Sequence, residues 1–203
     1  MAERLYLYPL WIRIWHGFNA LFILTLIITG ISMQYSNPEV PLIPFKTSVL
    51  LHNTAGIGIT IFYLFYFIVH RFSANRKHYR IEWKGWGKRI MQQMRYYIFG
   101  VFKKQDSPFK VTSEAKFNPL QKVTYLIVMF MVVPVLIITG LGLMFPEVIV
   151  NNVAGIGGTL LTALLHSFMG FIVLVFLVIH VYFCTMGSTM TANFKSIING
   201  WHE

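Results

Sequence analysis

The 203-residue chain is poor in cysteine and in charged residues, and each shortage excludes a class of protein. Its one cysteine, Cys184, excludes a disulfide framework, a CxxC metal site and a c-type haem attachment. Charged residues make up 12% of the chain, about half the usual fraction of a soluble domain, whereas hydrophobic residues make up 56%. The seven acidic residues all lie outside the long apolar runs, which argues against a carboxylate proton pump. This composition predicts an integral membrane protein.

Four apolar segments are each long enough to cross a bilayer as a helix, which takes about 20 residues. They cover roughly residues 14–33, 50–70, 123–144 and 160–185. Inside lipid the backbone must satisfy its own hydrogen bonds, so each segment is expected to be helical, with a kink at Pro134 in the third. The first segment is long enough to stay as an anchor rather than a cleaved signal. We therefore expect residues 1–203 to form one all-α membrane domain, a four-transmembrane-helix bundle.

Positive charge gathers in one of the connections between these segments. Thirteen of the 17 Lys and Arg lie within residues 71–122, whereas the other two connections carry only Glu39, Lys46 and Glu147. The positive-inside rule places this basic loop and both termini in the cytoplasm. The same distribution explains the net charge of +10 by topology, so we expect no nucleic-acid partner. Within the loop, residues 90–102 predict either an amphipathic helix on the membrane surface or a solvated loop.

The histidines are the polar residues that need an explanation in such a chain. An ionisable side chain inside a membrane is costly and usually functional, and imidazole is a common axial ligand of haem iron. His166 and His180 are 14 residues apart on one segment, which puts them within about 40° of the same helix face and about 21 Å apart along the axis. Five of the seven histidines lie in or at the ends of the segments: His16, His52, His70, His166 and His180. The other two, His78 and His202, are expected at the surface.

Topology gives His166 and His180 a partner at the same depth. The second and fourth helices both run inward, so His52 is level with His166 near the outer surface. The first helix runs outward, so His16 is level with His180 near the cytoplasm. Gly56 and Gly170 follow His52 and His166 by four residues, and such small residues let a flat macrocycle lie against a helix. The alternative is that these histidines are interfacial polar residues without a ligand.

His70 has two possible roles that the sequence leaves open. It could replace His16 opposite His180, or it could contact a haem propionate together with Arg71. We prefer the second role because His70 lies at the edge of its segment, beside a charged residue. Arg13 is a further candidate for a charge-assisted bond to a propionate.

A short repeat links the two halves of the chain. LIITG occurs at residues 26–30 and again at 136–140, and each copy is followed by a segment that carries His-x-x-x-Gly. The repeat indicates either two related hairpins or a coincidence in apolar sequence.

Three segments carry a resemblance to a known family: RIWHGFNALFILTLIITG at residues 13–30, LHNTAG at 51–56 and LLHSFMGFIVLVFLVIHVY at 164–182. Nearly the whole chain resembles the di-haem cytochrome b superfamily, which includes formate dehydrogenase gamma subunits and the b-type cytochromes of nickel–iron hydrogenases. The closest likeness is to thiosulfate reductase cytochrome b subunits. It rests on YLYPLWIRIWH, RYYIFGVF, KFNPLQK and the final INGWHE.

The resemblance implies a ligand set and a second site. His16, His52, His166 and His180 would ligate two b haems. The family's quinone site lies near the inner haem at the cytoplasmic start of the third helix, where KFNPLQK makes Asn118 and Gln121 candidate contacts for menaquinone or ubiquinone. Asn118 followed by Pro119 is equally typical of a helix N-terminus, with Asn118 as its cap.

These expectations combine into an electron relay across the bacterial inner (plasma) membrane. The chain would be the quinone-reactive subunit of a multi-pass oxidoreductase complex and would exchange electrons with an extracytoplasmic redox subunit. By family analogy that subunit is a multihaem cytochrome c or an iron–sulfur/molybdenum enzyme. Two alternatives stay open: a haem-free membrane anchor, and a stand-alone haem oxidoreductase that acts on a small molecule at the outer face.

Overall fold

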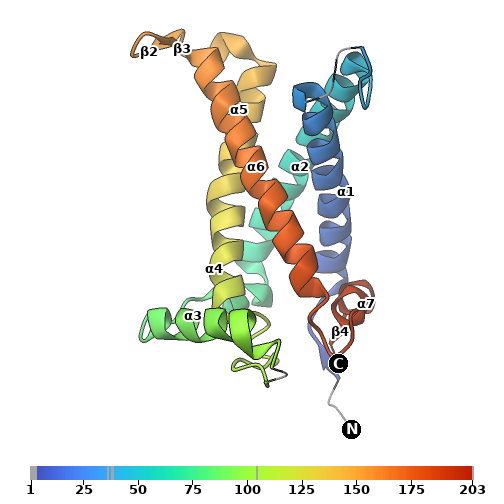
Figure 1. Ribbon diagram of the computed structural model, residues 1–203, viewed down its shortest axis with the longest axis vertical. Helices are drawn as coiled ribbons and strands as arrows, with labels where there is room; N and C mark the ends of the chain where they lie inside the picture. The colour runs from blue at the N-terminus through green and yellow to red at the C-terminus, as the bar shows by residue number, and fades with distance from the viewer. Residues whose placement is uncertain (1–3, 36, 38, 104, 203) are drawn as a thin grey trace.

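The computed structural model describes residues 4–35, 37, 39–103 and 105–202, and four of its helical runs are long and apolar enough to span a membrane (Figure 1). The four-helix all-α architecture predicted from the sequence is therefore confirmed. Most of the helices extend beyond the predicted apolar segments, because backbone hydrogen bonding continues through the polar and aromatic residues at each end. The four runs are α1 (Leu10–Tyr35), α2 (Phe45–Phe72), the continuous α4 (Pro119–Ile127), η3 (Val128–Val132) and α5 (Val133–Met144), and α6 (Gly158–Cys184).

The spans pack as two hairpins, α1 against α2 and α5 against α6, and α2 also touches α5. In the first hairpin the Trp15 indole stacks on Tyr66 with ring centroids 4.3 Å apart, and its Nε1 donates to the Phe62 carbonyl at 2.9 Å. A Cβ at Gly58 would lie 2.7 Å from the Phe22 ring, so glycine there leaves room for this ring between the two helices. The close packing fixes the depth of α1 relative to α2.

The third span contains a π-helical turn, η3, directly before Pro134. The Val133 N–H bonds to the Val128 carbonyl five residues back, which is the π pattern. Proline has no N–H to donate, and its ring crowds the carbonyl four residues earlier. The widened turn accommodates both effects, so the disturbance predicted at Pro134 takes the form of a π turn in a continuous span.

Four further helices and both described chain ends lie at one end of the bundle, where α3 runs across the bundle axis (Figure 1). The helical alternative for residues 90–102 is correct up to Gly100, and the helix begins earlier, at Trp86. Strand β1 (Leu5–Tyr6) pairs antiparallel with β4 (Trp201–His202), which ties the two ends of the chain together. The helices at this end are η1 (Ala74–Tyr79), α3 (Trp86–Arg95), the π-helical η2 (Tyr96–Gly100) and α7 (Ala192–Asn199).

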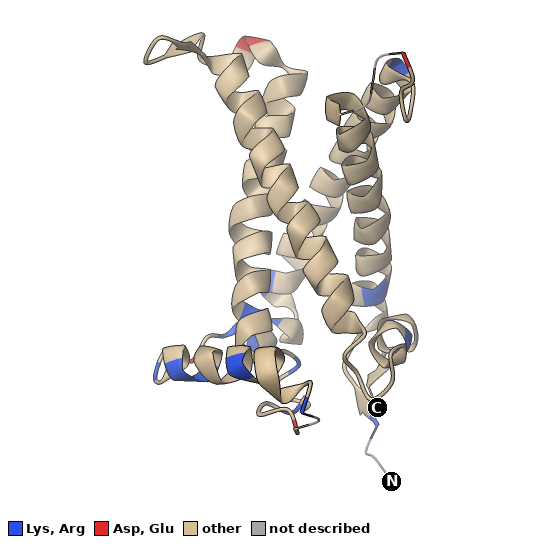
Figure 2. Ribbon diagram, viewed as in Figure 1, with Lys and Arg blue, Asp and Glu red and all other residues tan. Residues whose placement is uncertain are grey.

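The opposite end carries short connections and few charges. It holds η4 (Pro146–Val148) and an antiparallel hairpin of β2 (Asn152–Val153) and β3 (Ile156–Gly157). Figure 2 shows Lys and Arg gathered at the end with α3 and α7. The connections at the other end carry Glu39, Lys46 and Glu147. The bundle is thus strongly asymmetric in charge along its long axis.

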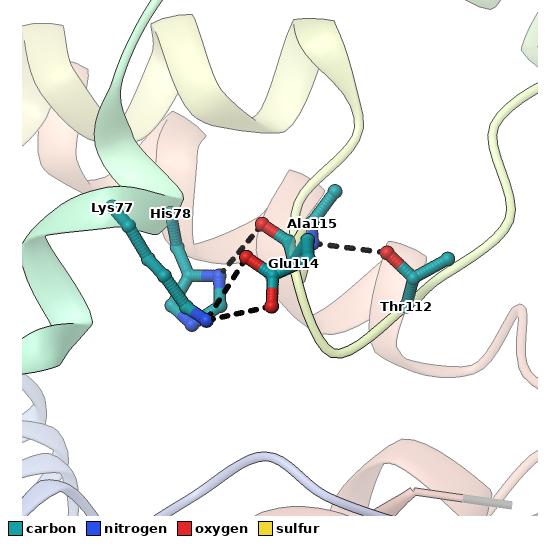
Figure 3. Close-up of polar contacts among 5 residues, drawn as sticks. All are labelled: Lys77, His78, Thr112, Glu114 and Ala115. Atoms are coloured by element: carbon teal, nitrogen blue, oxygen red, sulfur yellow. Dashed lines mark hydrogen bonds and ion pairs between the residues drawn. The ribbon is translucent and has the colours of Figure 1, made fainter.

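His78, expected at the surface, is instead buried, with 5% of its surface exposed. Its Nδ1 lies 3.3 Å from the Glu114 carbonyl oxygen, and the neighbouring Lys77 Nζ lies 3.0 Å from both Glu114 carboxylate oxygens (Figure 3). These contacts fasten the segment before α4 onto η1. The expectation was wrong because a contact between residues 36 apart leaves no mark in local composition.

The burial of His78 predicts a loss of stability in acid. Burial lowers the pKa of His78 to about 4, and the Lys116 and Lys77 charges act in the same direction. The unfolded chain binds a proton near pH 6.5 that the folded chain accepts only near pH 4, so the free energy of unfolding falls as the pH drops between these values. We expect a loss on the order of 3 kcal/mol.

Thermal unfolding midpoints of the solubilised protein across this pH range measure the effect. His78→Asn, whose amide can still donate to the Glu114 carbonyl, should remove most of the acid dependence. The same acid loss in this variant as in the wild type would show that His78 is not its source.

Candidate functional site

The structure brings four of the five span histidines together as two couples. The rings of His52 on α2 and His166 on α6 have centroids 6.2 Å apart. Those of His16 on α1 and His180 on α6 have centroids 6.3 Å apart. We call these the outer and the inner couple, the inner one being nearer the basic end. His166 and His180 are 14 positions apart, which separates the couples by about 21 Å along α6.

Each imidazole of the outer couple is held by a threonine from the preceding helix. Thr29 Oγ1 lies 2.9 Å from His52 Nδ1, and Thr139 Oγ1 lies 2.9 Å from His166 Nδ1. Both threonines are buried, at 1% and 7% exposure. The contacts fix the orientation of the two rings about their Cβ–Cγ bonds.

The threonines also fix which ring nitrogen can bind a metal. A hydroxyl has one hydrogen, and Thr29 and Thr139 give theirs to the backbone carbonyls of Thr25 and Val135, each at 2.6 Å. Their oxygens must therefore accept from the Nδ1–H of the histidines. In a neutral imidazole the lone pair then lies on Nε2, which is left to act as a ligand.

The LIITG repeat has a structural reason in these contacts. In both copies the fourth residue is the threonine that holds a histidine, and the glycine that follows lies against the same ring. A Cβ at Gly30 would lie 3.7 Å from His52 Cε1, and one at Gly140 would lie 3.1 Å from His166 Cε1. The two hairpins therefore build the outer couple in the same way, which favours related hairpins over coincidence.

The inner couple has different surroundings. The His180 ring stacks on Phe176 at 5.6 Å and meets the edge of Tyr125 at 6.1 Å. The Cys184 Sγ lies 3.8 Å from His180 Nε2, one helical turn further on. His16 lines a cavity of ≈ 320 Å³ together with Arg13, Gly17 and Ile198. Aromatic packing thus holds His180 of the inner couple, where threonine hydroxyls hold both histidines of the outer one.

Comparison with known proteins identifies the family of the chain that carries these couples. A sequence model of the prokaryotic cytochrome b561 family matches residues 7–200. The chain belongs to this family. It is also 34% identical over 202 residues to "Putative cytochrome YdhU" of Escherichia coli (strain K12), in an alignment that covers all of this chain and 76% of that protein. No solved structure gives a significant match.

Membership confirms the superfamily resemblance and the expected location. This cytochrome is a bacterial multi-pass membrane protein that binds haem b. The haem-free anchor is thereby excluded. The comparison gives neither the number of haems nor their ligands, and both belong to the proposal below.

The spacing of both couples fits a bis-imidazole haem. The zinc–histidine bond of about 2.0 Å serves as a guide to the metal–imidazole distance, and the ring centre lies roughly 1.1 Å beyond the nitrogen. Two imidazoles that bind one metal ion from opposite sides would then have ring centres roughly 6.2 Å apart. The observed centroid distances are 6.2 and 6.3 Å. A porphyrin supplies four nitrogens and leaves two axial positions, which is the number of imidazoles in each couple.

The small residues next to the outer couple also fit a flat macrocycle. A Cβ built at Gly56 or at Gly170 would meet no atom within 4 Å. Each glycine follows its histidine by one helical turn and therefore lies on the same helix face. A porphyrin bound between His52 and His166 would have room against both helices.

Arg13 suits the role predicted for it at the inner couple. It precedes His16 by one turn and lines the same cavity. One guanidinium nitrogen donates to the Ile198 carbonyl, while its Nε is buried without a hydrogen-bond partner among the described residues. A propionate oxygen is the kind of acceptor that would satisfy this donor.

The structure separates His70 and Arg71 from that corner. The His70 ring is buried against Tyr66, Tyr79 and Phe130, and its centroid distances to these rings are 5.2, 5.0 and 6.4 Å. The residue opposite His180 is His16, so His70 does not take its place. Arg71 lines a different cavity, at the end of α2. The contacts described for His70 and Arg71 therefore do not support the propionate role that we preferred for them.

Asn118 and Gln121 form a complete capping box at the start of α4. The Asn118 Oδ1 accepts from the Gln121 N–H at 2.9 Å, and the Gln121 Oε1 accepts from the Asn118 N–H at 3.2 Å. The Asn118 Nδ2 donates to the Tyr97 hydroxyl at 2.7 Å. The capping role is therefore present, and the Asn118 amide also ties the start of α4 to the Tyr97 phenol.

Several residues around the site were not predicted from the sequence. The LIITG repeat could have indicated Thr29 and Thr139, because threonine is its one polar residue. Lys116, the first residue of KFNPLQK, is 7% exposed and donates to the Asn75 Oδ1 at 3.0 Å. Its burial lowers its pKa to about 8. Nothing in the sequence distinguishes this buried lysine from the exposed ones of the same basic loop.

Proposed function

We propose that this cytochrome transfers electrons across the membrane between a quinone at its basic end and a redox partner at the other end. The observation that carries the proposal is the pair of histidine couples at two depths, with centroid distances of 6.2 and 6.3 Å. His52 and His166 would hold one haem b, and His16 and His180 a second. Bound haem supplies one-electron chemistry that the side chains lack.

The charge distribution supports the orientation of this path. Most Lys and Arg lie at the end with α3 and α7 (Figure 2). On the positive-inside rule we propose that this end, with both termini, faces the cytoplasm. The inner couple is then close to the cytoplasmic face and the outer couple close to the opposite face. A separation of about 21 Å along α6 covers most of a hydrocarbon core about 30 Å thick.

The quinone site is proposed at the start of α4, beside the inner couple. Asn118 there donates to Tyr97, and the Tyr97 ring stacks on Phe183 of α6 with centroids 4.3 Å apart. A phenol that accepts a hydrogen bond keeps its own O–H hydrogen to donate to a carbonyl. Burial raises the pKa of Tyr97, so the phenol keeps that hydrogen. Menaquinone and ubiquinone both present the carbonyl acceptor that this arrangement suits.

The partner is proposed to dock on the end with few charges. Exposed apolar side chains gather there, on the connection before α2 and on η4 and its neighbours: Val40, Leu42, Val148 and Val150. Exposed apolar surface outside the spans is typical of a contact with another protein. An extracytoplasmic multihaem cytochrome c or an iron–sulfur/molybdenum enzyme would exchange electrons with the outer couple across this surface.

Reduction by a quinol tests the proposal. The purified cytochrome in liposomes should show b-type haem reduction after addition of menaquinol or ubiquinol. The variant Asn118→Asp tests the site, because a carboxylate still caps α4 and suits the helix N-terminus but cannot donate to Tyr97. We expect unchanged thermal stability and haem content, with quinol-driven reduction slowed at least tenfold.

The control is Asn118→Ala, which removes the cap as well and should lower stability by about 1 kcal/mol. Wild-type rates in Asn118→Asp would leave Asn118 as a helix cap only. No reduction by either quinol, in protein that dithionite reduces fully, would contradict the proposed quinone reaction.

A further inference from the structure

A second cavity, of ≈ 940 Å³, lies where α2 ends, apart from both histidine couples. It takes its walls from the last turn of α2 and from η1, so it lies immediately after an apolar span, at the depth expected for lipid headgroups. Four of its lining residues are cationic and two are aromatic: Arg71, Arg76, Lys77, Arg80, Phe72 and Tyr79.

Three of these four cations lack an acidic partner among the residues that the structure describes. The ion pairs there join Lys77 to Glu114 and Arg89 to Glu82. The cavity therefore concentrates positive charge that its own walls leave uncompensated. A phosphate group, which accepts charge-assisted hydrogen bonds from several arginines at once, is the anion that such a site suits.

An apolar stripe leads from the spans into this cavity. Ile61, Leu64, Ile68 and Phe72 follow one another at helical spacing along α2, and all are exposed. Phe72, at 84% exposure, both ends the stripe and lines the cavity, and the Arg71 guanidinium lies 6.0 Å from its ring. A basic cavity continuous with a lipid-facing stripe matches an amphiphile with an anionic head and acyl chains.

We propose that the cavity at the end of α2 binds the phosphate headgroup of an anionic phospholipid. Arg71, Arg76 and Arg80 contact the phosphate, and the acyl chains lie along the exposed stripe of α2. Basic cavities on the cytoplasmic side of membrane proteins recognise lipid headgroups in this way. Bound lipid would join the end of α2 to η1, the element that also fastens the segment before α4 through Lys77 and His78.

Native mass spectrometry of the full-length protein with added phosphatidylglycerol or phosphatidylcholine tests the site. We expect phosphatidylglycerol to bind with preference, more weakly as salt is raised. Replacement of the three arginines by glutamine, in Arg71→Gln, Arg76→Gln and Arg80→Gln combined, should weaken this binding at least tenfold. A control that removes the same charge from exposed positions outside the cavity should change it less than twofold: Lys84→Gln, Lys88→Gln and Arg95→Gln combined.

Two further arms separate a lipid from a soluble phosphate. Glycerol phosphate should compete poorly, and Phe72→Ser should weaken phosphatidylglycerol binding while the arginines stay in place. An equal loss in both triple variants, no preference over phosphatidylcholine, or glycerol phosphate binding as tightly as the lipid would each overturn the proposal. None of these outcomes depends on haem content, which is measured separately on the same samples.

Discussion

His166→Ala is expected to reduce the haem content of the purified protein from two per chain to one. His166 forms half of the outer couple. Its loss would leave His52 as the single imidazole for the haem proposed there. The inner couple shares α6 but lies 14 residues further along, so its haem should remain bound and reducible by dithionite. Pyridine haemochrome spectra, set against protein concentration, measure the ratio. Added imidazole should restore part of the lost haem by replacing the missing ligand.

The matched variants separate ligands from other buried histidines. His16→Ala should also lose one haem, and it should be the inner one. His70→Phe should retain both haems, because the His70 ring packs among the rings of Tyr66, Tyr79 and Phe130 and is not part of either couple. Retention of both haems in His166→Ala, or loss of one in His70→Phe, would contradict the ligand assignment.

Thr139→Val is expected to raise the reduction potential of the outer haem and weaken its binding. Valine keeps the shape of threonine but leaves the His166 Nδ1–H without its acceptor at 2.9 Å. A hydrogen bond donated by Nδ1, the ring nitrogen away from the iron, makes the imidazole a stronger electron donor to iron. This favours the oxidised metal. Removing such a contact typically lowers the metal affinity by about 10–100-fold. We expect a shift on the order of 60 mV, a tenfold change for a one-electron couple.

Potentiometric titration followed in the haem absorption bands measures this shift. Thr139→Ser, which restores a hydroxyl, should recover the wild-type potential. Thr124→Val is the control, because the Thr124 hydroxyl donates to the Leu120 carbonyl of its own helix and to no histidine among the described residues. Thr29→Val should act like Thr139→Val, since Thr29 holds His52 in the same geometry. An outer potential unchanged in Thr139→Val would mean that the hydroxyl has no influence on the iron.

The membrane spans and the histidine couples could be predicted from sequence because each depends on a regular repeat. Twenty or so apolar residues determine a span. Helical rise and alternating direction then give each histidine a depth, and the level partners His52/His166 and His16/His180 are the residues that lie side by side. No contact between distant elements had to be known in advance.

The features that sequence reasoning missed depend on such contacts. Thr25, Thr60 and Thr124 each bond to a carbonyl of their own helix, which is the usual behaviour of threonine in an apolar helix. Thr29 and Thr139 do the same and in addition meet an imidazole on the next helix, a difference that no local pattern records. The burial of His78 and Lys116 likewise depends on how the basic loop folds back on itself.

A density map of the purified protein in lipid would test the central claim most directly. The account predicts two flat porphyrins per chain, one between the rings of His52 and His166 and one between those of His16 and His180. The rings in each couple should remain near their centroid distances of 6.2 and 6.3 Å. A porphyrin bound elsewhere, or a couple whose rings meet with no porphyrin between them, would contradict it.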